Sequence, residues 1–165
     1  MNIFVIFLGG VIGFVLGVLS VLILLKYFLK KLPSKKEDFD REKAKVKVLL
    51  KIIECKNSKV MIGDCKKYDK IRNIGIYGAG EIGQVLYENL DKDRMKVKCF
   101  IDRADKRFEI NGIKMRKPDN NLNDLDLIIM TAYDPYDYIS NSLKIDKEKI
   151  ISVDEFVRDN LYEKR

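Results

Sequence analysis

Residues 74–83 read Ile-Gly-Ile-Tyr-Gly-Ala-Gly-Glu-Ile-Gly, a short apolar run followed by three spaced glycines. The apolar run predicts a buried strand, and residues 81–90 (EIGQVLYENL) have the apolar spacing of an amphipathic helix. Glycines at the first, third and sixth positions of the turn let a strand lead directly into a helix that packs closely against it. This stretch therefore predicts an α/β domain whose first unit is a strand, a glycine turn and a helix.

Strands and helices continue to alternate after this unit. Further strands are predicted at residues 97–101, 125–130 and 150–153, and helices at residues 135–144 and 154–162. The Asn111-Gly112 pair between apolar residues predicts a tight turn. Alternation at this pitch implies right-handed crossovers and a parallel sheet of about four or five strands. The expected fold class is a small α/β, Rossmann-like domain with helices on both faces of the sheet.

The glycine turn and a following acid have the pattern of a dinucleotide-binding site. Gly78 permits the tight turn, Gly80 lets the backbone approach a pyrophosphate, and Gly83 allows helix and strand to pack closely. Asp102 ends the next predicted strand, 19 residues beyond Gly83, where a carboxylate accepts hydrogen bonds from an adenosine ribose. The N–H groups that begin the helix favour phosphate. The residues expected to bind the cofactor are Gly78, Ala79, Gly80, Glu81, Ile82, Gly83 and Asp102.

Two more residues are predicted at the same crevice. Arg103, beside Asp102, is compatible with a ribose 2′-phosphate, so the cofactor is predicted as NAD(P) without a choice between NAD and NADP. Thr131 ends the strand predicted at 125–130, and ligands of open α/β sheets bind at such strand ends. The alternative is that the glycines only form a turn and that these polar residues belong to ordinary loops.

Catalysis has little support in the composition. The 165-residue chain has no histidine, which removes Ser-His and Cys-His nucleophile pairs. The Tyr-x-x-x-Lys pair of short-chain sugar-nucleotide enzymes occurs only at Tyr27 and Lys31, outside the predicted domain. The three cysteines form no CxxC pair and are expected to be unpaired thiols. We predict no catalytic and no metal-binding residues, and a binding protein rather than a complete dehydrogenase or epimerase.

The N-terminal segment differs from the rest of the chain. Residues 1–25 contain no Asp, Glu, Lys or Arg, and the apolar run 3–25 ends at Lys26. A helix of about 20 apolar residues crosses the hydrocarbon core of a bilayer. A cleaved signal peptide would begin with basic residues and end at a small-x-small site, which this segment lacks. We therefore predict one permanent transmembrane helix ahead of the α/β domain and assign residues 1–31 to this anchor and its basic exit.

Basic residues gather just after the predicted span. Residues 26–51 hold ten Lys or Arg and four Asp or Glu, so most of the net charge of +7 lies there. The positive-inside rule then predicts a single-pass protein of the inner (plasma) membrane with its N-terminus outside and its domain in the cytoplasm. Such a cluster attracts anionic lipid head groups. The expected partner of the basic stretch is membrane lipid and not nucleic acid.

Small residues within the predicted span suggest association between spans. Gly9, Gly13 and Gly17 are four residues apart and fall on one stripe of a helix. Small residues at this spacing let two helix backbones approach closely, which predicts a homodimer or a pair with another span. The alternative is the ordinary enrichment of glycine in membrane helices.

A helix is predicted between the span and the sheet, at residues 35–53. Its apolar stripe, formed by Val46, Leu49, Leu50 and Ile53, needs a partner, which is either the body of the domain or the same helix of a second copy. We assign residues 32–71 to a juxtamembrane linker helix and loop, and residues 72–165 to the Rossmann-like nucleotide-binding domain.

The predicted strands resemble a known module. Ile74–Gly83, Phe100–Asp102, Asp126–Met130 and Ile150–Glu155 are similar to the nucleotide-binding module of bacterial cell-surface polysaccharide proteins, over about residues 70–157. The module also resembles the N-terminal half of membrane-bound capsular-polysaccharide sugar-nucleotide dehydratases and the C-terminal domain of some sugar C-methyltransferases. The resemblance implies a nucleotide or nucleotide-sugar ligand at Gly78, Gly80, Gly83 and Asp102. The catalytic half of those enzymes has no counterpart here.

These patterns lead to hypotheses of different classes. The first is a membrane-anchored nucleotide, dinucleotide or nucleotide-sugar binding protein that serves as an accessory or sensor component of cell-surface polysaccharide biosynthesis. The second is a structural adaptor that binds no ligand and recruits partner proteins at the membrane. A third is an enzyme completed by a separate catalytic subunit.

Overall fold

The computed structural model describes residues 20–24, 26, 35–103, 108–132, 139, 141–143 and 145–163. The chain divides into two compact units, Met1–Asp40 and Arg41–Arg165. The predicted transmembrane helix and its stripe Gly9, Gly13 and Gly17 lie almost wholly outside the described residues. Within the part of the chain that is described, no helix has both the length and the apolar character needed to cross a bilayer.

A six-stranded sheet forms the centre of the second unit. Its strands, in the order β3-β4-β2-β1-β5-β6, are β3 (Glu109–Ile110), β4 (Ile113–Arg116), β2 (Lys96–Ile101), β1 (Asn73–Tyr77), β5 (Leu127–Met130) and β6 (Ile150–Ser152). All neighbouring pairs are parallel except β3 and β4, which are antiparallel. The chain leaves β1 toward β2 on one side and later returns to place β5 on the other, so the strand order reverses at β1.

The predicted α/β class is confirmed, but the sheet has six strands and not the expected four or five, and one of its pairs is antiparallel. The strands that were not predicted are β3 and β4, which form a hairpin through Asn111 and Gly112. Both turn residues have positive φ, 53° and 75°, as the twist of a two-residue hairpin requires. The turn itself was predicted correctly, but a strand of two residues is too short to show an alternating pattern.

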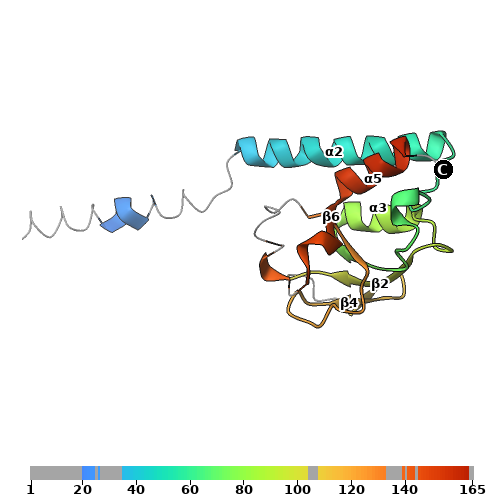
Figure 1. Ribbon diagram of the computed structural model, residues 1–165. Coiled ribbons are helices and arrows are strands. Elements are labelled where there is room, and N and C mark those ends of the chain that lie inside the picture. Colours follow the sequence, from blue (N-terminus) through green and yellow to red (C-terminus); the bar gives the residue numbers. More distant parts are fainter. Residues whose placement is uncertain are drawn as a thin grey trace, which may run out of the picture. The chain divides into compact units, whose positions relative to one another are not determined.

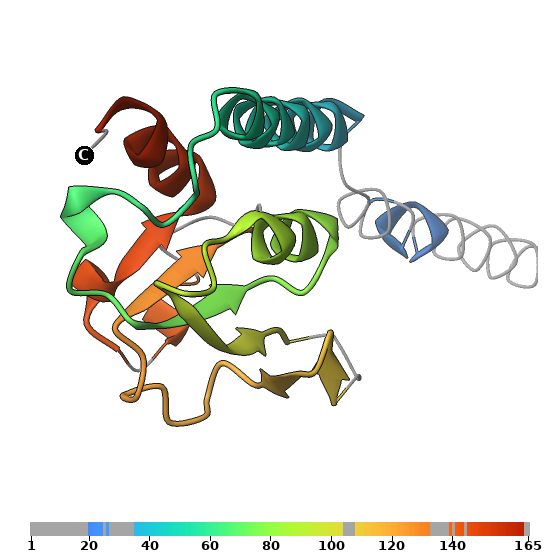
Figure 2. The same cartoon turned by 90° about the vertical axis from the view of Figure 1, so that its right-hand side faces the viewer.

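Three of the described helices form one layer beside the sheet. They are α2 (Lys35–Asn57), α3 (Glu81–Asn89) and α5 (Val153–Tyr162), with short 3-10 turns at Lys66–Tyr68 and Lys147–Lys149. Figures 1 and 2 show α2, α3 and α5 on the same side of the sheet. Their buried residues share one apolar cluster with alternate strand residues, among them Ile74, Ile76, Phe100 and Ile129.

The other face of the sheet has its own apolar cluster. Cys99, Ile101, Ile128 and Met130 pack there with residues such as Leu122 and Leu125 of the loop before β5 and Ile139 and Leu143 after it. Residues 139, 141 and 142 are helical, and the remainder of the helix predicted at 135–144 lies mostly outside the described residues. Both faces of the sheet are therefore covered, as expected for parallel strands.

Helix α2 from Arg41 onward is part of the compact unit that holds the sheet. Val48, Ile52 and Cys55 are 3%, 3% and 1% exposed and lie in the same cluster as the strands. Lys51 Nζ also donates a hydrogen bond to Asp154 Oδ1 of α5 at 2.7 Å. The α2 residues from Arg41 onward, which the sequence analysis assigned to a linker, thus pack on the domain.

The face of α2 that meets the body is not the predicted stripe. Of that stripe, only Leu49 packs against the core. Val46, Leu50 and Ile53 remain 53%, 61% and 51% exposed. The body of the domain therefore covers only a small part of the predicted stripe.

The connection between α2 and β1 is held by polar contacts to α5. Asp159 Oδ2 accepts hydrogen bonds from Tyr68 Oη at 2.6 Å and Lys67 Nζ at 2.7 Å. The Gly63 N–H donates to Asn160 Oδ1 at 2.7 Å, and the Tyr68 ring lies 4.9 Å from that of Phe156. Burial raises the pKa of Tyr68, and its hydrogen bond to Asp159 raises it further. This cluster fixes the loop 58–72 on the helical layer.

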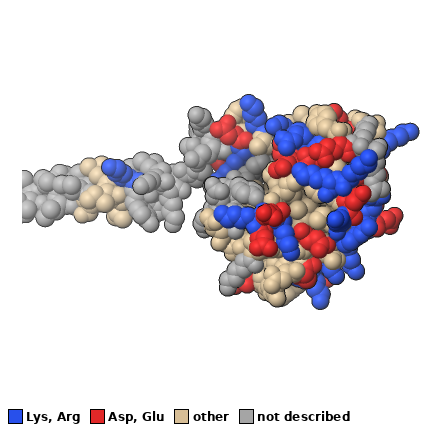
Figure 3. All heavy atoms as spheres, viewed as in Figure 1, with Lys and Arg blue, Asp and Glu red and all other residues tan. Residues whose placement is uncertain are grey.

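Charges of both signs are mixed over the surface of the second unit. On the face seen in Figure 3, Lys and Arg alternate with Asp and Glu. This agrees with the sequence, in which residues 52–165 hold 22 basic and 21 acidic side chains. The excess of positive charge belongs to the segment before residue 52.

Candidate functional site

The glycine turn joins β1 to α3 beside the end of β5. Gly78 has φ of 102°, a conformation that residues with a Cβ rarely adopt. Its N–H donates to the Ile101 carbonyl of β2 at 2.9 Å, and an added Cβ would lie 2.7 Å from Thr131 Oγ1. Gly78 is thus required both by the backbone conformation and by the lack of space.

Gly83 is required by close packing alone. It lies in the first turn of α3, and an added Cβ would be 2.1 Å from the Gly78 carbonyl oxygen. No non-bonded carbon and oxygen approach so closely, so α3 can pack on the turn only with glycine here.

Gly80 differs from both of its neighbours in the motif. It is the N-cap of α3 with φ of −76° and ψ of −169°, which any residue adopts, and no side chain caps the helix. A Cβ added to Gly80 would have no atom within 4 Å. Neither conformation nor packing demands glycine, so what Gly80 preserves is open space at the start of α3.

That space is a cavity of about 260 Å³. Seven of the nine predicted site residues line it, together with Lys45 and Ala132: these seven are Gly78, Gly80, Glu81, Ile82, Gly83, Asp102 and Thr131. Ala79 is buried beneath the turn, and Arg103 is exposed and does not line the cavity. The structure therefore brings the glycine turn and the two strand ends together.

Asp102 faces the turn from the end of β2. Its Oδ2 accepts a hydrogen bond from the Ala79 N–H at 3.0 Å, and its own N–H donates to the Arg116 carbonyl at 3.2 Å. The carboxylate is therefore fixed beside Gly80 at the rim of the cavity. Because the Ala79 N–H donates to Asp102, it does not face a ligand. The backbone N–H groups that begin α3 have no acceptor within the helix and can donate to a ligand.

Thr131 positions the turn. Its N–H donates to the Tyr77 carbonyl at 2.8 Å, and its Oγ1 lies 2.9 Å from that oxygen and 3.0 Å from the Gly78 carbonyl. The hydroxyl hydrogen is thus directed to the backbone, and the residue is only 6% exposed. Thr131 locks the end of β5 to the glycine turn.

Lys45 was missed by the sequence analysis. It lies on α2 one turn before buried Val48, and this spacing carries its partly exposed side chain to the cavity, where the ammonium pairs with Glu42. Ten basic residues lie between positions 26 and 51, and nothing local distinguishes Lys45 from the others. Ala132 also lines the cavity and was not predicted. It directly follows Thr131, and ligands of open α/β sheets bind at the carboxyl ends of strands, so the same argument could have identified it.

The cavity presents groups of both charges. Lys45 and the uncapped start of α3 provide positive charge and N–H donors, and Asp102 provides a fixed acceptor. Over the described ranges, no three Cys, Asp or Glu side chains are grouped to hold a metal ion.

The cysteines lie outside this cavity. All three are free and buried, and burial raises the pKa of Cys55 and of Cys99 to about 11, so both thiols stay protonated at neutral pH. Neither thiol is therefore activated as a nucleophile.

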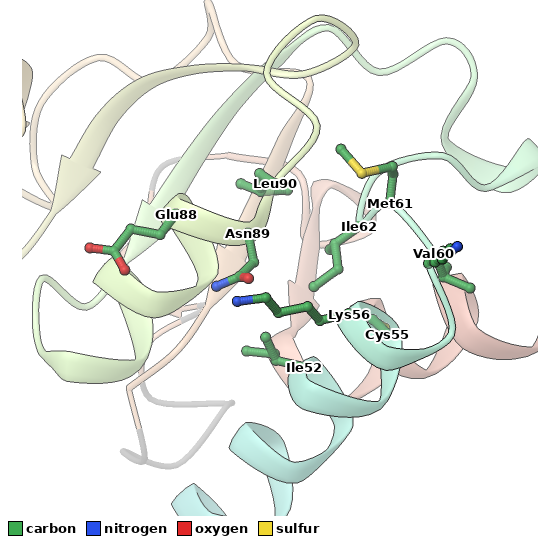
Figure 4. Close-up of a pocket in the computed structure, with 10 residues that line it drawn as sticks. Ile52, Cys55, Lys56, Val60, Met61, Ile62, Glu88, Asn89 and Leu90 are labelled. Atoms are coloured by element: carbon green, nitrogen blue, oxygen red, sulfur yellow. The ribbon is translucent and has the colours of Figure 1, made fainter.

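A second cavity, of about 240 Å³, lies at the opposite end of α3. Figure 4 shows it between the end of α2, residues 59–62 and the last turn of α3, with the Lys56 side chain reaching toward Asn89. The C-terminal end of α3 has free backbone carbonyls and the negative end of the helix dipole, so it favours cations. Lys56 and Lys59, which line this cavity, fit that preference. An anionic ligand is favoured at the other end of α3, in the cavity at the glycine turn.

Comparison with known proteins gives one match. A family described as C2185-like, N-terminal, matches residues 70–151, a range that contains β1 to β5, the glycine turn, α3 and the first two residues of β6. No curated protein and no solved structure matches the chain.

Proposed function

We propose that the second unit is a Rossmann-like module that binds the diphosphate of a nucleotide, dinucleotide or nucleotide-sugar at the glycine turn. The observation that carries the proposal is the contrast among the three glycines. Gly78 and Gly83 are enclosed by packed atoms, whereas Gly80 between them borders empty space at an uncapped helix N-terminus. A turn with only a structural role would not need glycine at the one position where a side chain fits.

The strand order supports the same location. β2 and β5 flank β1, and the chain reaches them by connections that leave β1 in opposite directions. In open α/β sheets, ligands bind outside the carboxyl ends of the strands at such a switch point. Gly78, Asp102 and Thr131 follow the ends of β1, β2 and β5 and line one cavity.

Each side of the cavity suits a different part of the ligand. The N–H groups of Glu81 and Ile82 and the ammonium of Lys45 suit phosphate oxygens, and Asp102 suits ribose hydroxyls. A volume of about 260 Å³ is below the roughly 300–1,000 Å³ of most small-molecule pockets. The cavity therefore takes the diphosphate and adjoining ribose, and the remainder of the ligand extends along the strand ends.

We further propose that this module is held at the cytoplasmic face of the inner membrane and serves as an accessory or sensor component in cell-surface polysaccharide biosynthesis. The support is the apolar run at residues 3–25, the basic stretch at 26–51, and the resemblance of the strands to modules of polysaccharide proteins. Among the described residues that line the cavity, the Thr131 hydroxyl contacts backbone carbonyls and the Asp102 carboxylate accepts from the Ala79 N–H. These structural contacts favour sensing or carrying over conversion of the ligand.

A structural adaptor is the second candidate. The observation that favours it is the exposed apolar stripe of α2, which offers a surface to another protein without any ligand. The two candidates differ in one measurable property, because only the first predicts that a nucleotide stabilises the fold.

Ligand-dependent melting of the full-length chain in detergent tests the proposal. All three cysteines are buried, so a thiol-reactive fluorophore reports unfolding. NAD, NADP, UDP-sugars and coenzyme A are added separately, and a bound ligand at 100 times its Kd adds about 2.7 kcal/mol of stability. Gly80→Val adds a Cβ that meets no atom within 4 Å and two methyl groups that occupy the space at the start of α3. It is expected to melt close to the parent while losing the ligand response.

The matched control is Lys43→Gln, which changes an exposed residue of α2 and is expected to keep the ligand response. An unchanged melting temperature with every ligand at millimolar concentration would contradict nucleotide binding and leave the adaptor. A ligand response that survives in Gly80→Val would place the binding site elsewhere.

A further inference from the structure

Helix α2 carries two apolar faces. Val48, Ile52 and Cys55 face the sheet and are at most 3% exposed. Val46, Leu50 and Ile53 have the same spacing, but are displaced around the helix and are 51–61% exposed. At about 100° per residue, the two stripes lie on nearly opposite sides of α2. The second stripe, here called the outer stripe (Val46, Leu50 and Ile53), therefore points away from the body that buries the first.

The outer stripe has the spacing of a coiled-coil seam. Steps of four and then three residues place Val46 and Ile53 at d positions of a heptad and Leu50 at the a position between them. In a coiled coil, apolar residues at successive a and d positions meet their counterparts on a second helix.

Charges beside the outer stripe are complementary to those of a second copy. In this heptad Glu42 is at g and Lys47 is at e. In a parallel pair, the g residue of one helix faces the e residue of the next heptad on its partner, so Glu42 meets Lys47 of the other copy on both sides of the seam. Their side chains are 66% and 67% exposed and so are accessible for these contacts.

We propose that α2 pairs in parallel with α2 of a second copy of this chain through the outer stripe. The helix is already ordered by its inner face, so pairing does not have to overcome the cost of helix formation. The inference does not rest on the proposed function, because Lys45 lies about a quarter turn away from the outer stripe and pairing leaves the glycine-turn cavity open.

Cysteine cross-linking of the full-length chain in intact cells tests the seam. In a parallel pair, equal a positions adjoin across the symmetry axis, so Leu50→Cys is expected to give a disulfide-linked dimer under a mild oxidant. The matched control is Lys56→Cys, an exposed g position of the same helix about 90° from the stripe. In a parallel pair the two equal g residues lie on opposite sides of the seam and face e residues, so they do not adjoin each other. The parent chain is a second control, because its cysteines are buried.

Cross-linking at Leu50→Cys at least several times faster than at Lys56→Cys supports the pair. Equal rates at both positions, or no cross-link at either, overturn it, because copies brought together elsewhere would not favour the outer stripe. The ligand-dependent melting described above is unaffected by either result, so failure of the pair and failure of nucleotide binding are distinguishable.

Charge reversal in the Leu50→Cys background tests the parallel register. Glu42→Lys alone and Lys47→Glu alone each place like charges together on both sides of the seam and are expected to slow cross-linking about fivefold. The double reversal restores opposite charges and is expected to recover the rate. A double variant that cross-links no faster than the single variants overturns the parallel pairing.

Discussion

The three glycines of the motif have different surroundings, so the same substitution is expected to change stability by different amounts at Gly80 and Gly83. Gly83→Ala places a methyl group 2.1 Å from the Gly78 carbonyl oxygen, and two backbone segments must separate to admit it. We expect a loss of about 3 kcal/mol of folding stability, as for severe overpacking. Gly80→Ala meets no atom within 4 Å and is expected to be near neutral. Melting of both variants without ligand measures the difference.

An equal loss in the two variants would contradict this reading of the turn. It would mean that the space at Gly80 is needed for folding and not for a ligand, and the argument for the cavity would fail with it.

Asp159 makes the stability of the domain depend on pH. Burial alone would raise the pKa of this carboxyl, but hydrogen bonds from Lys67 and Tyr68 outweigh it and hold the pKa below its ordinary value. Its stabilisation is therefore complete above the unfolded-state pKa of about 4 and is lost as pH falls through the lower folded pKa. Asp159→Asn is expected to cost about 2 kcal/mol at pH 7, because a buried charged hydrogen-bond acceptor is lost.

Urea unfolding of the parent and of Asp159→Asn at several pH values measures this effect. The difference in unfolding free energy is expected to be constant from about pH 7 to pH 5 and to shrink below about pH 4. A difference that stays the same down to pH 3 would show that the carboxylate charge is not what stabilises the cluster.

At the scale of elements, α2 shows what a sequence pattern leaves undetermined. Strands β1, β2, β5 and β6 and helices α3 and α5 were predicted to within a few residues, because apolar periodicity is a local property. The Asn111-Gly112 turn was also predicted, but not the short strands β3 and β4 on either side of it. In α2, two stripes have the same spacing, and only the position of the sheet decides which of them is buried. The predicted stripe includes Val46 and Leu50, with the body of the domain or a second copy as its alternative partners, whereas the residues that α2 buries on the domain are Val48 and Ile52.

The inner face of α2 predicts that this helix belongs to the folding unit of the sheet. Ile52→Ala removes a side chain that is 3% exposed and is expected to cost about 3 kcal/mol. Ile53→Ala changes the next residue, which is 51% exposed, and is expected to cost less than about 1 kcal/mol. Both substitutions are made in a Leu50→Glu background, so that pairing of α2 contributes nothing to the unfolding free energy.

Equal costs at Ile52 and Ile53 would contradict the packing of α2 on the domain. The helix would then behave as the separate linker that the sequence analysis assigned to residues 32–71.

At the scale of the whole molecule, the candidate site combines residues that are local in sequence with one that is not. The glycines are a motif, and Asp102 and Thr131 follow from the rule that parallel strand ends meet at one edge. Lys45 reaches the cavity only because α2 packs on the same side of the sheet as α3, which no sequence pattern at Lys45 states. Tertiary packing therefore supplies the only Lys or Arg side chain among the described residues that line the cavity.

A substitution at Lys45 distinguishes a direct contact between its ammonium and the ligand from attraction by the overall charge of the basic segment. Lys45→Gln keeps an unbranched polar side chain but removes the charge, and is expected to weaken binding of a diphosphate ligand about three- to tenfold, with the larger effect at low salt. Lys43→Gln removes the same charge from an exposed site two residues away on α2 and is expected to leave the affinity unchanged. Titration of the melting temperature with ligand at two salt concentrations compares them. Equal losses would mean that the basic segment attracts the ligand only through its overall field, and that the ammonium at the cavity makes no contact with the diphosphate.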